Sequence, residues 1–315
     1  MKNRPNTHSH ASRRDALRLF SLPVASAVCA LSAPAVLAQT PPMTQKLPRI
    51  VSVNGAMTES VYALGAEKQL VGTDTTSLFP AAALQTPKVG YMRQLSAEGL
   101  LSLRPDAVIG TTEAGPSVVM DQVRSAGVKV ELVEADHSWA ELQRKVAAVG
   151  RATARMRQAT ALQARLDAQW AEVLAQVSTQ LARSGGRKPM AIFILAHTAS
   201  PQVAGHLTAA QAIFGYAGLA NAFTGTGSPN PFNGYRPMTS EALAAAAPEL
   251  IVTTTQGIEA GGGLEKFWSR PGLELTPAYR RRALVALDAL YLIGFGPRLP
   301  QAVGELHQAA WRVAA

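Results

Sequence analysis

Apolar and polar residues alternate along the chain in short blocks that switch between the period of a strand and the period of a helix. Helical spacing of Met57, Val61 and Leu64, closed by Gly65, follows a β-rich apolar run at residues 49–53. Further apolar runs predict strands at residues 70–72, 107–110, 128–133, 190–196, 250–255 and 284–287, and helical patterns occupy residues 118–125, 209–216 and 299–313. Strands separated by helices predict an α/β protein with doubly wound, mainly parallel sheets.

Between residues 138 and 183 the apolar spacing is helical throughout and contains no proline. Ser138 and Glu141 form a capping-box pattern at its start, and Gly185 and Gly186 follow its end. A helix over this range would be about 65–70 Å long. We therefore predict a single long helix joining two α/β lobes, the alternative being two helices broken near Gly150.

One phrase occurs twice, because residues 95–109 return as residues 238–252, 143 positions later, without a gap. The repeat places Glu98 opposite Glu241, and just upstream it places Arg93 opposite Arg236. A single pair of copies is no solenoid, which needs several tandem repeats. Each copy predicts a helix followed by a strand. The pair predicts two similar lobes that present matched charged groups, with a ligand cleft between the lobes.

The first 38 residues have the pattern of an export signal. Arg13 and Arg14 precede an apolar run at residues 19–37, and small residues lead to a cleavage site after Ala38. The stretch at residues 12–18 also fits a twin-arginine signal, so the export route stays open. We expect residues 1–38 to be this signal, 39–47 a linker, 48–137 the N-terminal lobe, 138–183 the long helix and 184–315 the C-terminal lobe.

Composition narrows the classes of function. The only cysteine, Cys29, lies in the signal, so the mature chain has no disulfide, thiolate metal site or cysteine nucleophile. The formal charge of +9 falls to +5 once the signal's five basic residues and one acidic residue are removed. That excess, without a long basic run, argues against nucleic-acid binding. No nucleophile elbow, phosphate loop or His-Glu-x-x-His motif is present, so we expect no enzyme activity and no catalytic cofactor.

Three loops are candidates for ligand binding, because open α/β sheets bind ligands at the carboxyl ends of their strands. They are residues 90–93, residues 233–236 and the segment around His197. An isolated tyrosine is usually a half-buried packing residue, but the segment in which Tyr91 lies favours a role in the site. Tyr235 is equally compatible with packing or with the site. His197 ends an apolar strand.

Several segments together resemble the periplasmic haem-binding proteins of haem ABC importers. They are residues 49–53, 62–66, 74–77, 89–93, 96–99 and 234–237, with the Gly-Tyr-Met-Arg run at 90–93 the most discriminating. These importers' binding proteins belong to the long-helix-linked class III substrate-binding proteins, which also include cobalamin and siderophore binders. The resemblance covers nearly all of the mature chain and implies a periplasmic protein that carries haem to an inner-membrane permease.

The resemblance makes Tyr91 the axial ligand of the transported ferric haem b. A phenolate is a known haem ligand, and because a free phenol has a pKa near 10, iron and a nearby cation must favour deprotonation. Arg93 is two residues away, and in an extended loop its side chain would lie on the same side as Tyr91. The resemblance also brings Arg236 from the opposite lobe to the haem edge or the tyrosine oxygen, the alternative being an ordinary surface arginine. It allows His197 to be a second iron ligand or a wall of the haem pocket, the alternative being an ordinary polar strand-end residue.

In the same importer class a glutamate from each lobe docks onto arginine pockets of the permease dimer, which here would be Glu98 and Glu241. Their alternative role is to stabilise a helix N-terminus through the helix dipole. We expect the protein itself to be a monomer. Two other functions remain open: a siderophore or cobalamin binder on the same scaffold and, more remotely, a secreted metal-dependent hydrolase.

Overall fold

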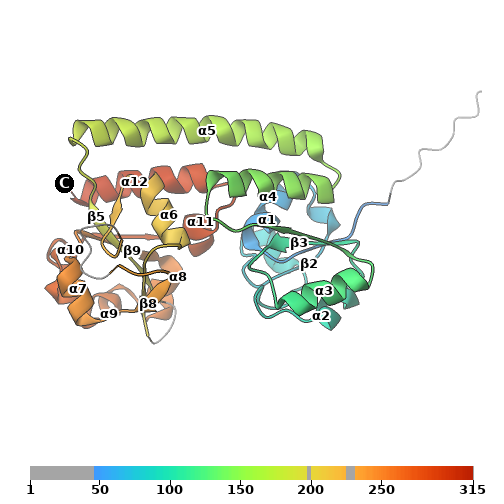
Figure 1. Ribbon diagram of the computed structural model, residues 1–315, viewed down its shortest axis with the longest axis horizontal. Coiled ribbons are helices and arrows are strands. Elements are labelled where there is room, and N and C mark those ends of the chain that lie inside the picture. The colour runs from blue at the N-terminus through green and yellow to red at the C-terminus, as the bar shows by residue number, and fades with distance from the viewer. Residues whose placement is uncertain (1–45, 197–199, 225–230, 315) are drawn as a thin grey trace, which may run out of the picture. The chain divides into compact units, whose positions relative to one another are not determined.

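Two β-sheets organise the part of the chain that the computed structural model describes, which comprises residues 46–196, 200–224 and 231–314 (Figure 1). The expected export signal lies outside these ranges, as do His197 and most of the expected linker. The α/β class that the hydrophobic pattern predicts is confirmed.

The N-terminal sheet has four parallel strands in the order β2-β1-β3-β4. Its strands are β1 (Ile50–Ser52), β2 (Leu70–Thr73), β3 (Ala107–Thr111) and β4 (Lys129–Val133). Successive side chains of a strand point to opposite faces, so Ile50 joins one apolar cluster while Val51 and Val53 join another. Helices cover both faces: α1 (Gly55–Ala63) and α4 (Trp139–Ala152) on one, α2 (Ala97–Ser102) and α3 (Ser117–Ser125) on the other.

The C-terminal sheet has the order β10-β9-β5-β6-β8, and β7 pairs with β5 beside this path. Strand β6 is antiparallel to both of its neighbours, β5 and β8, and β8 lies at one edge of the sheet. Its strands are β5 (Met190–Leu195), β6 (Gln202–Ala204), β7 (Ala220–Asn221), β8 (Tyr235–Pro237), β9 (Leu250–Thr254) and β10 (Leu284–Leu287). The remaining helices are α5 (Met156–Arg183), α6 (Ala209–Tyr216), α7 (Ser240–Ala246), α8 (Thr255–Ala260), α9 (Leu264–Trp268), α10 (Pro277–Arg281), α11 (Ala289–Ile293) and α12 (Leu299–Ala314).

The repeated phrase folds the same way in both copies. In the first copy it forms α2 followed by β3, and in the second α7 followed by β9. The hydroxyl of Ser96 accepts the N–H of Gly99 at the start of α2, and that of Thr239 accepts the N–H of Ala242 at the start of α7. Local sequence signals alone are therefore enough to set these two helix-to-strand units.

The single helix predicted over residues 138–183 is wrong, because the chain forms two helices, α4 and α5, with a turn between them. The N–H of Arg155 bonds to Gly150 O at 2.8 Å and that of Ala154 to Arg151 O at 3.2 Å, which is a Schellman motif. Ala154 holds the left-handed position (φ 55°) that glycine usually fills. The alternative break near Gly150 is thus the correct one. At Gly150 an added Cβ would lie 2.6 Å from the Cβ of Ala159, so this glycine lets the two helices pack closely.

Helix α5 packs along both α4 and α12 (Figure 1). It buries one apolar stripe and leaves its other faces polar; the buried residues are Ala159, Leu162, Leu166, Trp170, Val173 and Val177. Trp170 stacks on Trp139 of α4 at 4.5 Å between ring centroids and meets the edge of Tyr216 of α6 at 4.8 Å. Among the described residues, no helix combines the length and apolarity needed to cross a membrane.

Replacing Ala154 with glycine is expected to raise the free energy of unfolding by about 0.5–1 kcal/mol. A left-handed conformation costs an L-residue with a Cβ roughly 1–2 kcal/mol, part of which glycine returns as extra entropy of the unfolded chain. Denaturant unfolding measures the difference. The matched control is Ala164→Gly on the exposed face of α5, which should lose about 1 kcal/mol. Equal destabilisation by both substitutions would contradict the described end of α4.

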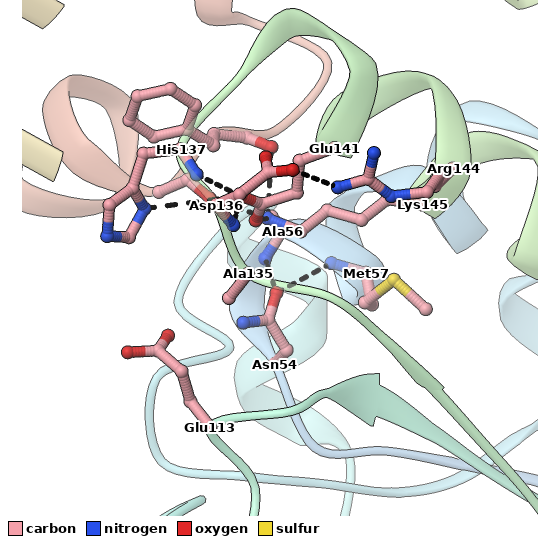
Figure 2. Close-up of polar contacts among 12 residues, drawn as sticks. Asn54, Ala56, Met57, Glu113, Ala135, Asp136, His137, Glu141, Arg144 and Lys145 are labelled. Atoms are coloured by element: carbon pink, nitrogen blue, oxygen red, sulfur yellow. Dashed lines mark hydrogen bonds and ion pairs between the residues drawn. The ribbon is translucent and has the colours of Figure 1, made fainter. Parts of the chain in front are cut away.

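A buried ion pair lies at the start of α4 (Figure 2). Lys145 Nζ lies 2.5 Å from Glu141 Oε1, and each side chain is only 2% exposed. The capping box is confirmed in part: Ser138 Oγ accepts the N–H of Glu141, but the Glu141 carboxylate accepts the N–H groups of Asp136 and His137. Burial lowers the pKa of the Lys145 ammonium although Glu141 lies beside it. Desolvation therefore outweighs attraction in this pair.

Two polar contacts fasten the segment that precedes α12 to the N-terminal part of the chain. Lys145 Nζ donates to Phe295 O at 3.3 Å and to Gly294 O at 3.4 Å. Arg298 forms two hydrogen bonds, of 2.9 and 3.0 Å, with the carboxylate of Glu59 in α1. The two halves of the sequence are thus joined by these side chains as well as by the helices α4 and α5.

Candidate functional site

The loop that carries Tyr91 is fixed by backbone hydrogen bonds on both of its sides. Thr75 N–H donates to Gly90 O at 2.9 Å, and Gly115 N–H donates to Met92 O at 2.9 Å. Gly90 adopts φ 100°, a conformation that residues with a Cβ rarely take. Met92, between Tyr91 and Arg93 in the sequence, is buried, whereas the side chains of Tyr91 and Arg93 are exposed. The two flanking side chains are consequently held at the surface.

Tyr91 and Arg93 lie together, as predicted. Arg93 Nη1 donates to Tyr91 Oη at 3.4 Å, and the tyrosine is 39% exposed. The segment is a turn closed by a hydrogen bond from Gln94 N–H to Tyr91 O, not the extended loop that we expected. The arrangement offers an accessible phenol with a permanent cation at its oxygen.

Glu113 completes this group and was missed in the sequence. Its carboxylate forms a very short ion pair with Arg93 Nη2. Partial burial tends to lower the pKa of the Arg93 guanidinium, but Glu113 and Tyr91 raise it above its ordinary value. Glu113 lies two residues after the end of β3, so the rule that ligand loops lie at the carboxyl ends of strands could have identified it. We call Tyr91, Arg93 and Glu113 the Tyr91 cluster.

Other polar groups at the same edge of the sheet are used to hold loops. Asn54 Oδ1 accepts the N–H groups of Ala56 and Met57 and so caps α1 (Figure 2). Asp74 is fully buried and accepts hydrogen bonds from Thr76 and Ser77. Asn54 and Asp74 thus use side-chain oxygens to hold the local backbone and side chains, whereas Tyr91 and Arg93 are exposed.

On the C-terminal sheet, the edge strand β8 carries Tyr235 and Arg236. Burial raises the pKa of the Tyr235 phenol to about 12, an effect that Arg93 opposes and Glu113 reinforces. Arg93 and Glu113 lie on loops of the N-terminal half, so Tyr235 is within electrostatic reach of that half. Burial thus disfavours the phenolate form of Tyr235, which makes this phenol a poor candidate for a phenolate ligand.

Arg236 is exposed, and its guanidinium carbon lies 4.5 Å from the centre of the Phe232 ring. Within the described ranges it has no carboxylate partner within 4.0 Å and no contact with Tyr91. The expected meeting of Arg236 with the Tyr91 cluster is thus not seen as a direct contact. Its charge is available to a ligand.

His197 lies outside the described residues. Across the part of the chain that the structure does describe, no group of three or more His, Cys, Asp or Glu side chains could hold a metal ion.

Glu98 and Glu241 occupy equivalent positions in the first turns of α2 and α7, and both are exposed. The hydroxyls of Ser96 and Thr239 provide the caps, so neither carboxylate is needed for that purpose. Neither glutamate has an ion-pair partner among the residues with described side chains. Helix-dipole stabilisation remains as a local role, and both carboxylates are free to meet a partner.

Comparisons with known proteins agree on one kind of protein. The family model described as "Periplasmic binding protein" matches residues 50–291. A solved structure of the periplasmic haem-binding protein BhuT in complex with two haems is 42% identical, covers 85% of this chain and 99% of its own, and has a TM-score of 0.78.

Two curated relatives are more distant. The ABC transporter substrate-binding lipoprotein YvrC of Bacillus subtilis is 25% identical over 265 residues, which cover 84% of this chain and 80% of YvrC. The vitamin B12-binding protein of Yersinia pestis is 28% identical over 121 residues, 38% of this chain and 41% of that protein. This chain therefore matches less than half of the vitamin B12-binding protein.

Proposed function

Since the chain belongs to the periplasmic binding protein family, we propose that it captures ferric haem b in the periplasm and delivers it to an inner-membrane ABC importer. The observation that carries the proposal is the exposed Tyr91 phenol with the Arg93 guanidinium 3.4 Å from its oxygen. The likeness to BhuT, which holds haem, supports it over a large part of the chain. The role is binding and transfer, with no bond made or broken in the ligand.

In this proposal Tyr91 supplies the axial oxygen to the haem iron. Phenolate is a hard anionic donor that suits ferric iron and is a known haem ligand. Arg93 would stabilise the negative charge on that oxygen through its hydrogen bond. Arg236 would receive a haem carboxylate, because a guanidinium fork bonds carboxylates at two points. His197 stays a candidate for a second iron ligand.

We further propose that residues 48–137 and 184–315 act as two lobes around the haem, with α4 and α5 between them. The N-terminal 38 residues would direct export and be removed near Ala38. The mature protein would act as a monomer, and its partner would be the permease dimer of the importer. Each of these statements extends the sequence-based expectations.

A cobalamin carrier is the second candidate, because the vitamin B12-binding protein of Yersinia pestis matches part of the chain. A competition experiment separates the two. The purified apo-protein is mixed with hemin and then challenged with cyanocobalamin or a ferric siderophore in tenfold excess. Haem transport predicts that hemin stays bound. Displacement of hemin by cyanocobalamin or by the siderophore would contradict haem as the ligand.

Reversing both docking charges, Glu98→Lys with Glu241→Lys, is expected to abolish haem uptake and leave haem binding unchanged. A pseudo-twofold pair of carboxylates fits a twofold permease, and reversal would turn attraction into repulsion. Hemin titration measures binding, and growth on haem as the sole iron source measures uptake. The control reverses Glu67 and Glu265, which are also exposed and lie in helices of the two halves. If binding and uptake fall together, the docking role is wrong.

A further inference from the structure

Arg93 is already occupied on two sides. One terminal nitrogen, Nη1, donates to Tyr91, and the other, Nη2, pairs with Glu113. The charge of the guanidinium is therefore balanced by a carboxylate within the same cluster. A second carboxylate that approached Arg93 would meet the negative charge of Glu113 or have to displace it.

This pairing is built into one piece of the chain. The loop that carries Glu113 is tied to the loop of Tyr91 by two backbone hydrogen bonds, Gly115 N–H to Met92 O and Leu95 N–H to Gly115 O, both 2.9 Å. Thr112 N–H also donates to Val133 O at 2.9 Å, which fixes the loop to the sheet. Glu113 thus lies beside Tyr91 and Arg93 on a loop that is hydrogen-bonded to theirs.

Arg236 has the opposite character. It is exposed, lies over the Phe232 ring and has no acidic partner in the described ranges. The internal segments outside those ranges, residues 197–199 and 225–230, contain no Asp or Glu in the sequence. Its positive charge is consequently uncompensated, while that of Arg93 is neutralised.

Resting on the proposed haem function, we propose that Glu113 is a specificity-determining residue that reserves Arg93 for the iron ligand. It does so by neutralising the guanidinium beside Tyr91, so that the carboxylates of the haem turn toward Arg236. The two arginines that the sequence repeat pairs thus have different tasks. Arg93 holds the oxygen of Tyr91, and Arg236 recognises the acidic edge of the ligand.

The test compares the affinity for hemin with that for hemin dimethyl ester, which carries the same iron but no carboxylates. Wild-type protein is expected to prefer hemin, and Arg236→Gln to lose most of that preference. Glu113→Gln should increase the preference about fivefold at low ionic strength, the scale of a partly exposed ion pair. The double variant should regain a preference through the freed Arg93. All these differences should shrink in about 1 M salt, where the Debye length is about 3 Å.

The chain offers a matched control in Glu131→Gln. Glu131 pairs with Arg151 at nearly the same exposure, 35% and 55%, as Glu113 with Arg93 at 34% and 54%. This variant removes the same charge and should leave the preference unchanged. An unchanged preference in Glu113→Gln, or an intact one in Arg236→Gln, would overturn the inference.

Iron-free protoporphyrin IX separates this inference from the proposed function. It keeps both carboxylates and lacks the iron that Tyr91 would bind. If the variants rank in the same order by their affinity for this probe as by their affinity for hemin, the assignment of Arg236 holds independently of iron. If hemin gives a Tyr91-dependent spectrum while the ranking is absent, the inference alone fails. If no hemin binds to any variant, the proposed function fails and the inference with it.

Discussion

Replacing Lys145 with methionine is expected to lower the free energy of unfolding by about 3–5 kcal/mol. The substitution leaves the Glu141 carboxylate, 2% exposed, without its cation at 2.5 Å. It also removes the donor to the carbonyl oxygens of Gly294 and Phe295. A loss of that size is a large fraction of the roughly 5–15 kcal/mol that stabilises an ordinary domain.

A second substitution distinguishes the stranded charge from lost packing. In the double variant with Glu141→Gln, no charge is buried, and the amide oxygen can still accept from the N–H groups of Asp136 and His137. It should regain much of the lost stability. Arg124→Met, which breaks an exposed pair with Asp121, is the control and should cost less than about 1 kcal/mol. Wild-type stability of Lys145→Met in urea would contradict the burial of this pair.

This ion pair also shows where sequence reasoning stops. Glu141 and Lys145 are four residues apart, a spacing common on solvated helix faces. Nothing local reveals that this face packs against the segment at Gly294 and Phe295, some 150 residues away. The cap that Ser138 gives to α4 was predictable because a cap depends on neighbouring residues, whereas the acceptance of the Asp136 and His137 N–H groups by Glu141 was not.

The same distinction explains the break between α4 and α5. Helix ends are predicted from glycine and proline, and the left-handed position here is filled by Ala154. The close contact of Gly150 with Ala159, which joins the two helices, is visible only once the chain has folded. By contrast, the repeated phrase gave correct helices and strands twice, since its caps and apolar runs act over a few residues.

The candidate site likewise contains some residues that the sequence predicts and others that it does not. Tyr91 and Arg93 were predictable because they are two residues apart on one turn. Glu113 joins them from a loop 20 residues further along the chain. The electrostatic influence of Arg93 and Glu113 on Tyr235 depends on the packing of the C-terminal sheet near the N-terminal one. Pairings of this kind need the tertiary structure.

Replacing Tyr91 with phenylalanine is expected to weaken hemin binding by at least about 100-fold, more than the 10- to 100-fold that loss of an outer-shell partner costs a metal site. The variant removes one oxygen from an exposed loop whose fold depends on Gly90, Met92 and backbone hydrogen bonds, so stability should be unchanged. Tyr62→Phe removes the same atom from a half-buried tyrosine of α1 and is the control. It should bind hemin like the wild type.

The absorption spectrum of the protein during titration with hemin tests the central claim most directly. The wild type and Tyr62→Phe should saturate with a ferric tyrosinate-type spectrum. Tyr91→Phe should lack that spectrum at every hemin concentration while melting at the wild-type temperature. A ferric tyrosinate spectrum that persists unchanged in Tyr91→Phe would contradict the assignment of Tyr91 as the iron ligand.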